Sequence, residues 1–308
     1  MKTYKLLLLV GMGIMMLTGC KDEAVENEDW CLDPSYSRPF VVNVDIQRDF
    51  KPFVTVDSVF KTRATDSGLI LKYYVAAYRG HSPEPLKVSS SFDNNVQMAL
   101  TPGKYDFVAW VNYESQTKGL GANFYTDDFT ELLLRNKYNY SGASIAKIGY
   151  RGSKHYSIAY TTDSLTLSAS PAMGQYRLIF TDTVAYKPAK VMVRYSSKIP
   201  AAIDGKDGTI NWWWDDISFT SKPSGNVLAS DFILSQPTQT SVTAVVEVYD
   251  ENGYLRARKK DLEIPLINGG ITTIRGNFLS ILELDESTGD GAGISINTEW
   301  DSSFDIEI

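Results

Sequence analysis

The chain has 308 residues, with 30 Lys and Arg against 37 Asp and Glu, which gives a formal net charge of −7 at pH 7. An acidic protein repels the phosphate backbone of nucleic acids, so we expect no nucleic acid partner. The content of 18 Tyr, 13 Phe, 6 Trp and 22 Gly favours strands and turns, and it predicts an all-β protein.

Residues 1–19 have the pattern of a bacterial lipoprotein signal peptide. Lys2 and Lys5 precede the apolar run 6–16, which is too short to span a bilayer permanently. The run closes with Leu17-Thr18-Gly19-Cys20, in which small residues precede a cysteine. We therefore expect cleavage before Cys20 and acylation of Cys20, because several acyl chains anchor a protein stably in a membrane. A plain secretory signal and a short membrane helix are the alternatives.

Residues 20–38 are predicted to be an acidic tether, because residues 21–29 have too little apolar surface to fold alone. Lys21-Asp22-Glu23 also resembles the charged signal that directs lipoproteins of Bacteroides-type bacteria to the outer surface of the outer membrane. The resemblance implies a surface-exposed, lipid-anchored protein of the cell outer membrane. An ordinary solvated spacer is the alternative.

Residues 39–162 are predicted to form an N-terminal β-sandwich domain. In residues 40–46, Val42, Val44 and Ile46 share one face of a half-buried strand. Further strands are expected over residues 69–78 and 105–112. One short helix is predicted over residues 126–134, because Thr126-Asp127-Asp128 can cap a first turn and three leucines follow.

Residues 163–284 are predicted to form a C-terminal β-sandwich domain, with strands over 164–168, 175–181 and 190–195. A hairpin is expected from strands 241–249 and 255–266, because Asn252-Gly253 between them suits a tight turn. Residues 271–284 add one or two strands. Within 285–308, a flexible linker over 285–293 precedes a last strand with Ile294, Ile296, Phe304, Ile306 and Ile308.

The sequence offers few groups for catalysis, and we expect neither enzyme activity nor a cofactor. His81 and His155 are the two histidines, and both have a polar, loop-like setting. No zinc helix motif, nucleophile elbow or phosphate-binding glycine loop is present in the sequence. Cys31 has no partner once Cys20 is acylated, so it is a packed or idle thiol rather than part of a disulfide framework.

The acidic clusters also have structural explanations, and we expect no metal site. Asp204-Gly205-Lys206-Asp207-Gly208 resembles a calcium loop only superficially, because Lys206 replaces an oxygen ligand. We interpret this segment as a polar turn. Asp215-Asp216 fits a solvated turn as easily as a glycosidase pair, which spacing alone cannot establish.

Trp212, Trp213 and Trp214 are the most unusual local feature. Three adjacent side chains of a strand point to both of its faces, so at least one indole should lie outside a one-sided core. An exposed indole can stack on a sugar or bind a protein partner. Burial against a neighbouring domain or loop is the alternative.

Several segments together resemble the fimbrillin-like lipoproteins of Bacteroides-type bacteria, especially the fimbrial anchor and accessory subunits. The segments are the Leu-Thr-Gly-Cys motif that ends at Cys20 and residues 102–110, 171–182, 195–200, 264–266 and 273–279. The resemblance implies two tandem β-sandwich domains of transthyretin-like (Greek-key) topology. It also implies a subunit that builds or anchors pili, in which one subunit donates a strand to the next. A donated strand pairs the free backbone groups of an open sheet edge.

Two details of that resemblance stay open. Family stalk subunits are cut after an arginine near the first strand, and Arg63 is either such a site or an ordinary loop residue. Residues 294–308 are either a donor strand or the last strand of their own domain. The leading hypothesis is a fimbrial anchor or accessory subunit that binds other fimbrial subunits and supports adhesion to a host or glycan ligand. A surface glycan-binding lipoprotein of a polysaccharide-uptake system, using Trp212–Trp214, is the rival hypothesis.

Overall fold

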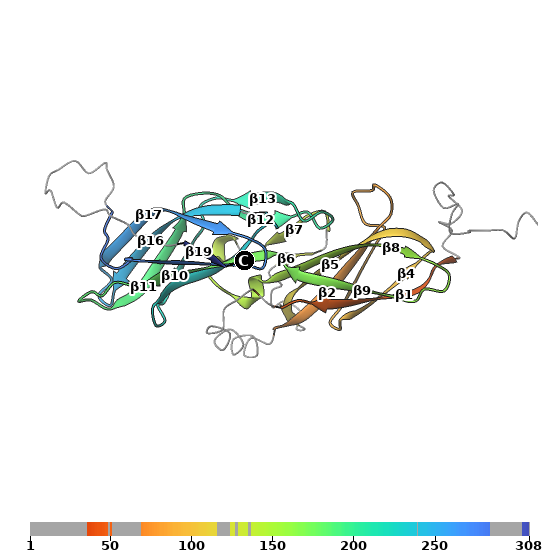
Figure 1. The fold of residues 1–308 in the computed structure, drawn as a ribbon, viewed down its shortest axis with the longest axis horizontal. Coiled ribbons are helices and arrows are strands. Elements are labelled where there is room, and N and C mark those ends of the chain that lie inside the picture. The colour runs from red at the N-terminus through yellow and green to blue at the C-terminus, as the bar shows by residue number, and fades with distance from the viewer. Residues whose placement is uncertain are drawn as a thin grey trace, which may run out of the picture.

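The structure is a computed structural model that describes residues 36–48, 50, 69–115, 124–126, 129–134, 137–238, 240–283 and 304–307. Regular structure in these residues is almost entirely β-strand, with the short 3-10 helices η3 (Lys137–Asn139) and η4 (Ile145–Lys147). The strands form four sheets in a sandwich-like arrangement, which extends along one long axis (Figure 1). The prediction of an all-β fold is confirmed.

One seven-stranded sheet occupies one end of the long axis, and we call residues 36–171 the first half. Its strand order is β3-β2-β5-β8-β9-β1-β4, and β1 and β9 run parallel. The outermost strands β3 and β4 contact each other, so the sheet curls around its own core. Its strands are β1 (Arg38–Ile46), β2 (Leu69–Tyr78), β3 (Lys87–Ser91), β4 (Asn95–Leu100), β5 (Gly103–Ser115), β8 (Gly149–Ile158) and β9 (Ser164–Pro171).

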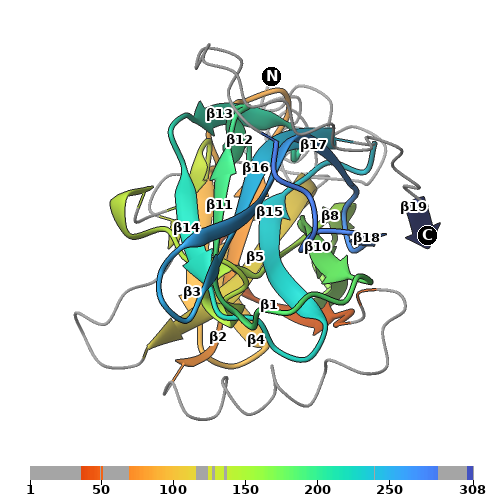
Figure 2. The ribbon, with the colours of Figure 1, turned by 90° about the vertical axis from the view of Figure 1, so that its left-hand side faces the viewer.

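Two four-stranded sheets form most of the other end, and we call residues 173–283 together with 304–307 the second half. Viewed along the long axis, β14, β11 and β16 lie on one side and β10 and β18 on the other (Figure 2). Their strand orders are β15-β10-β18-β19 and β14-β11-β16-β17. The strands are β10 (Met173–Phe180), β11 (Pro188–Tyr195), β14 (Ser218–Ser221), β15 (Val227–Leu234), β16 (Thr240–Asp250), β17 (Leu255–Leu266), β18 (Ile271–Gly276) and β19 (Phe304–Glu307).

The fourth sheet joins the two halves. Its order is β13-β12-β7-β6, with β6 (Phe124–Tyr125) and β7 (Leu132–Leu134) from the first half and β12 (Ile199–Ile203) and β13 (Ile210–Trp214) from the second. The junction is the antiparallel pairing of β7 with β12. A sheet therefore runs continuously from one half into the other.

The predicted helix over residues 126–134 is wrong, because Leu132–Leu134 forms strand β7. Leu132 and Leu134 are buried and Leu133 is half-buried, which is the alternation of a strand and not a helical stripe. Pairing with β12 supplies backbone partners that sequence cannot reveal, and it overrides the local helix signal. Asp127 and Asp128 lie outside the described residues.

Strand β9 pairs with strands that precede it in the sequence. Its residues were expected to start the C-terminal domain of 163–284, but β9 pairs with β1 and β8 in the sheet of the first half. Parallel pairing with β1 joins segments that are far apart in sequence, so alternation within β9 could not reveal its sheet. The division of the chain into two domains stays a prediction.

The predicted hairpin of β16 and β17 is confirmed. Gly253 has a φ of 83°, while Asn252 does not adopt a positive φ, so only one residue of the Asn-Gly pair uses the left-handed region. The Asp250 carboxylate accepts hydrogen bonds from the backbone N–H groups of Asn252 and Tyr254, at 2.9 and 3.0 Å. The Asp250 carboxylate thus serves as the acceptor for two backbone N–H groups of the turn.

Leu167 tests whether β9 belongs to the core of the first half. Its side chain is 1% exposed, while the neighbouring Thr166 points to solvent. We expect Leu167→Ala to lower the free energy of unfolding by about 2–5 kcal/mol, because it removes buried methyl groups and leaves a cavity. Thr166→Ala is the control and should change little. Urea unfolding of both variants measures the difference, and equal stabilities would contradict this placement of β9.

Candidate interaction site

Several predicted site residues lie outside the described residues. Cys20, Cys31 and Arg63 are among them, so acylation and proteolytic processing stay predictions. Among the residues that the structure describes, no helix has the length and hydrophobicity to cross a membrane. The same residues contain no cluster of three or more His, Cys, Asp or Glu side chains that could hold a metal ion.

The two histidines lie in different settings. His81 is exposed in the turn that follows β2. His155 was expected in a loop but lies in the middle of β8, where its Nδ1 is 2.8 Å from Asp106 Oδ1 on the neighbouring strand β5. Both side chains of this pair are well exposed, so it is a cross-strand surface pair.

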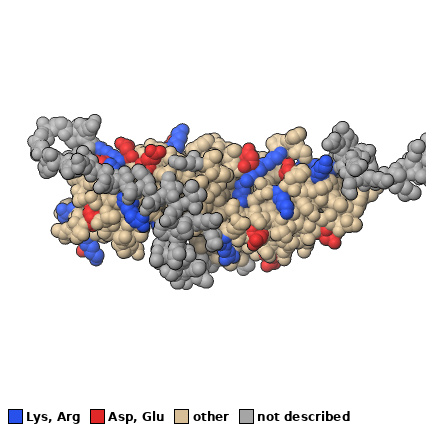
Figure 3. Space-filling view, in the orientation of Figure 1, with Lys and Arg blue, Asp and Glu red and all other residues tan. Residues whose placement is uncertain are grey.

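The segment 204–208 is a turn closed by its own carboxylates, in agreement with the interpretation as a polar turn. Asp204 Oδ1 accepts the backbone N–H of Lys206 at 2.7 Å and that of Asp207 at 3.1 Å. Asp215 forms an ion pair with Lys137 at 2.7 Å, and this pair lowers the pKa of the Asp215 carboxyl. Figure 3 shows acidic and basic side chains intermixed on one face of the molecule.

The three tryptophans lie on β13, an outermost strand of the fourth sheet. Trp212 is 54% exposed and Trp213 is 47% exposed, while Trp214 is buried. The expectation that at least one indole lies outside the core therefore agrees with the structure. We call Trp212 and Trp213 the indole edge, because both project from an edge strand into solvent.

Strand β1 fills a slot between β9 and β4, and we call this arrangement the β1 slot. It pairs parallel with β9 and antiparallel with β4. Phe40, Val42 and Val44 point into the core and are at most 1% exposed. Phe40 stacks on Phe107 of β5, with ring centroids 5.7 Å apart. Burial of each such side chain stabilises the fold by about 1.5–3 kcal/mol.

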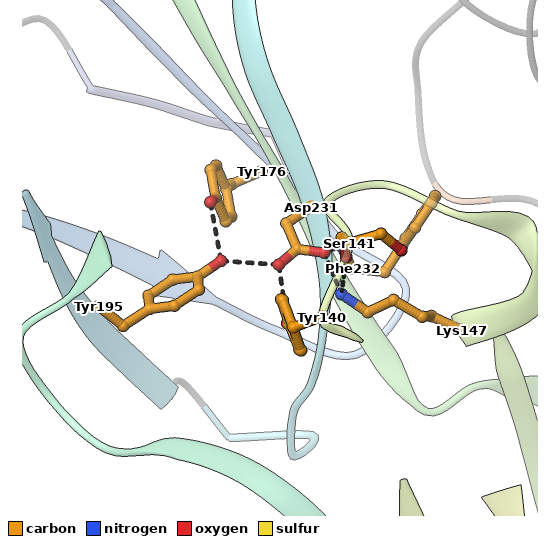
Figure 4. Close-up of polar contacts among 7 residues, drawn as sticks. All are labelled: Tyr140, Ser141, Lys147, Tyr176, Tyr195, Asp231 and Phe232. Carbon is orange, nitrogen blue, oxygen red and sulfur yellow. Dashed lines mark hydrogen bonds and ion pairs between the residues drawn. The ribbon is translucent and has the colours of Figure 1, made fainter. Parts of the chain in front are cut away.

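A buried polar cluster lies where the two halves meet, and we call it the Asp231 cluster (Figure 4). It comprises Tyr140, Lys147, Tyr176, Tyr195 and Asp231. Asp231 Oδ2 accepts the hydroxyl groups of Tyr140 at 2.8 Å and Tyr195 at 2.7 Å. Lys147 Nζ contacts Asp231 Oδ1, and the hydroxyl groups of Tyr176 and Tyr195 lie 2.8 Å apart.

Burial dominates the electrostatics of the Asp231 cluster. It raises the pKa of Tyr140, Tyr176 and Tyr195 well above the ordinary value for a phenol, and the negative charge of Asp231 adds to the shift. The phenols therefore keep their protons and remain donors. Burial also lowers the pKa of Lys147, although contact with Asp231 acts in the opposite direction.

Sequence reasoning missed the Asp231 cluster. Lys147 and Asp231 are 84 positions apart, and each is a single charged residue in an otherwise apolar neighbourhood. The available signal was Asp231 within the apolar strand β15, where a charge is costly unless it is paired. Its partner could not be identified without the fold.

Comparisons with known proteins return one family and several distant structures. The sequence model of DUF6562, described as a family of unknown function, matches residues 40–308. A search of curated proteins found no match.

Three crystal structures illustrate the structural similarity. A candidate cell adhesion protein from Bacteroides ovatus has 9% identity and a TM-score of 0.45, covering 78% of this chain and 92% of that one. A fimbrial assembly protein from Parabacteroides distasonis has 10% identity and a TM-score of 0.43, with coverages of 88% and 99%. A candidate polysaccharide-binding protein from Bacteroides thetaiotaomicron has 11% identity and a TM-score of 0.43, with coverages of 72% and 80%. At these values the similarities do not determine what this chain binds.

Tyr195 tests the energetic role of the Asp231 cluster. We expect Tyr195→Phe to lower the free energy of unfolding by about 1–3 kcal/mol, because a buried oxygen of Asp231 loses a donor that water cannot replace. Tyr254→Phe is the matched control, since Tyr254 is 64% exposed. Thermal unfolding of both variants provides the measurement. A Tyr195→Phe protein as stable as the control would show that this hydrogen bond contributes nothing.

Proposed function

We propose that this chain, which belongs to the DUF6562 family, is a lipid-anchored subunit of a surface fimbria that joins neighbouring subunits by strand exchange and supports adhesion. In this proposal it is an anchor or accessory subunit of the cell outer membrane, and it has no catalytic role. The observation that carries the proposal is the position of β1, which is inserted between β9 and β4 of its sheet. Fimbrillin-like segments in the sequence point in the same direction.

Strand β1 has the properties of a replaceable element. It is separated from β2 by residues 47–68, which include the predicted processing site Arg63. A cut there would leave β1 in place through hydrogen bonds and burial alone. If β1 left, backbone groups of β9 and β4 would lose their partners. The core positions that Phe40, Val42 and Val44 fill would become empty. Another strand of matching pattern would restore these interactions.

The C-terminal segment carries that matching pattern. Phe40, Val42 and Val44 of β1 repeat an aromatic residue followed by two β-branched residues at alternate positions, and Phe304, Ile306 and Ile308 have the same spacing and character. In the structure, β19 pairs with β18 of its own chain, which corresponds to the last strand folding back. Strand β19 is the outermost strand of its sheet, so it can leave β18 without disrupting the pairing of any other two strands.

Disulfide trapping distinguishes the two locations of the C-terminal strand. If Ile306 of one copy occupies the position of Val42 in another, it lies opposite Val96 of β4, because Val42 pairs with Val96. We expect Val96→Cys with Ile306→Cys, in a Cys31→Ser background, to yield a ladder of covalently linked copies on the cells that encode the protein. Non-reducing electrophoresis of outer membranes measures the ladder.

The control uses the partner of Ile306 within its own chain. Thr272→Cys with Ile306→Cys should give a link within one chain, because these residues pair between β18 and β19. Adding Arg63→Ala to the first pair should suppress the ladder if processing there opens the slot. Efficient Thr272–Ile306 linkage without any Val96–Ile306 ladder would refute strand exchange between copies of this chain.

The indole edge supports a second candidate function, the binding of surface glycans. An exposed indole ring presents an apolar face on which the C–H face of a sugar can stack, while its N–H remains available to a hydroxyl group. Trp212 and Trp213 both have such exposure on an edge strand.

Glycan-array binding tests this second function. We expect Trp212→Ala combined with Trp213→Ala to reduce glycan binding at least about tenfold, which corresponds to the loss of about 1.4 kcal/mol. Tyr138→Ala is the control, because Tyr138 is 97% exposed but lies outside β13. Array signals that are absent in the natural protein, or equal in both variants, would exclude the indole edge as a glycan site.

A further inference from the structure

The Lys147–Asp231 pair connects the two halves inside the protein. Lys147 ends η4, just before β8 of the first half, and Asp231 lies in β15 of the second half. Their side chains are 4% and 0% exposed, and Nζ is in direct contact with Oδ1. An amine and a carboxyl group are thus held together with almost no access to water.

We propose that Lys147 and Asp231 condense to an intramolecular amide bond, which links the two halves covalently. The bond between Nζ and Cγ forms, and the bond between Cγ and Oδ1 breaks. Two of the three protons on the ammonium group leave with Oδ1 as one molecule of water, and the third remains on the amide nitrogen. No oxidant, reductant or co-reactant is required.

The groups around the pair suit each stage of this reaction. The hydroxyl groups of Tyr140 and Tyr195 donate to Oδ2, where negative charge develops when the amine attacks Cγ. The backbone N–H of Phe232 donates to Oδ1, the oxygen that departs. The carbonyl oxygen of Ser141, 3.2 Å from Nζ, is placed to accept the remaining amide proton. In the product, Oδ2 keeps both phenol donors.

Burial favours the neutral product over the ion pair. Two charges removed from water carry a large desolvation cost, whereas an amide with satisfied hydrogen bonds does not. Burial also lowers the pKa of Lys147, which promotes the neutral amine that acts as nucleophile. Exclusion of water opposes the reverse reaction, hydrolysis.

A second Lys–Asp pair provides the contrast within the same chain. Lys137 and Asp215 are 2.7 Å apart, but their side chains are 32% and 62% exposed. Water solvates both charges and competes for any activated carboxyl group. Contact alone therefore does not predict condensation, and we expect Lys137 and Asp215 to remain an ion pair.

Peptide mass spectrometry of the unfolded, trypsin-digested full chain tests the proposal. We expect a branched peptide that contains both Lys147 and Asp231, with a mass one water below the sum of its two linear parts. Fragmentation should place the link at these two side chains. Lys147→Arg should yield linear peptides only, and Lys137→Arg should retain the branched peptide.

The peptide masses of the natural chain test the amide bond by themselves, whether or not the Lys147→Arg variant folds. Recovery of Lys147 and Asp231 solely in separate linear peptides would overturn the proposal and leave a non-covalent ion pair. A water loss located elsewhere in the chain would overturn it equally. Neither outcome depends on whether the protein is a fimbrial subunit.

Discussion

The first half of the molecule depends on the pairing of one nine-residue strand, β1, with neighbours on both of its sides. Backbone N–H and C=O groups inside a sheet must find partners, and β1 supplies them to β9 and to β4. The strand also places Phe40, Val42 and Val44 in the core, so hydrogen bonding and apolar burial act on the same element. Strand β1 lies inside the sheet, between β9 and the outermost strand β4, and residues 47–68 alone connect it to β2, so strand replacement is physically reasonable.

The connection between the halves has a different character. The pairing of β7 with β12 continues a sheet from one half to the other, which needs only backbone groups and apolar side chains. The Asp231 cluster instead buries the polar side chains of Asp231 and Lys147, an arrangement that is costly without compensation. Asp231 accepts hydrogen bonds from two phenols and one backbone N–H, and its Oδ1 contacts the side-chain nitrogen of Lys147, which together provide that compensation. Hydrogen bonds are directional, so the cluster favours one relative placement of the two halves.

Local patterns predicted the strands well and their partners poorly. Alternation identified β1, a nearly continuous apolar run identified β2, and the Asn-Gly turn identified the β16–β17 hairpin, because each signal lies within one short segment. Residues 132–134 were misassigned because the leucines satisfy a helix or a strand equally until β12 is placed beside them. The sheet to which β9 belongs could not be predicted for the same reason, since parallel pairing with β1 joins segments about 120 residues apart, a separation that no local pattern encodes. The Asp231 cluster requires four separate segments to converge, so only its individual polar residues were visible in the sequence.

Anchoring and strand acceptance make opposite demands on the same N-terminal segment. Cys20 precedes β1 and Arg63 follows it, so under the proposed function an uncut, acylated copy would keep its lipid, and its own strand would still fill its slot. A copy cut at Arg63 can release β1 and accept a foreign strand, but the lipid then leaves with β1. Under the proposed function, one sequence would serve as a membrane anchor or as an internal subunit, according to whether the peptide bond after Arg63 is intact. The C-terminal strand β19 is affected neither by the lipid nor by a cut after Arg63, because it lies at the edge of a sheet in the other half. An uncut copy at the membrane can donate that segment without accepting one, which is the arrangement that a terminal subunit requires.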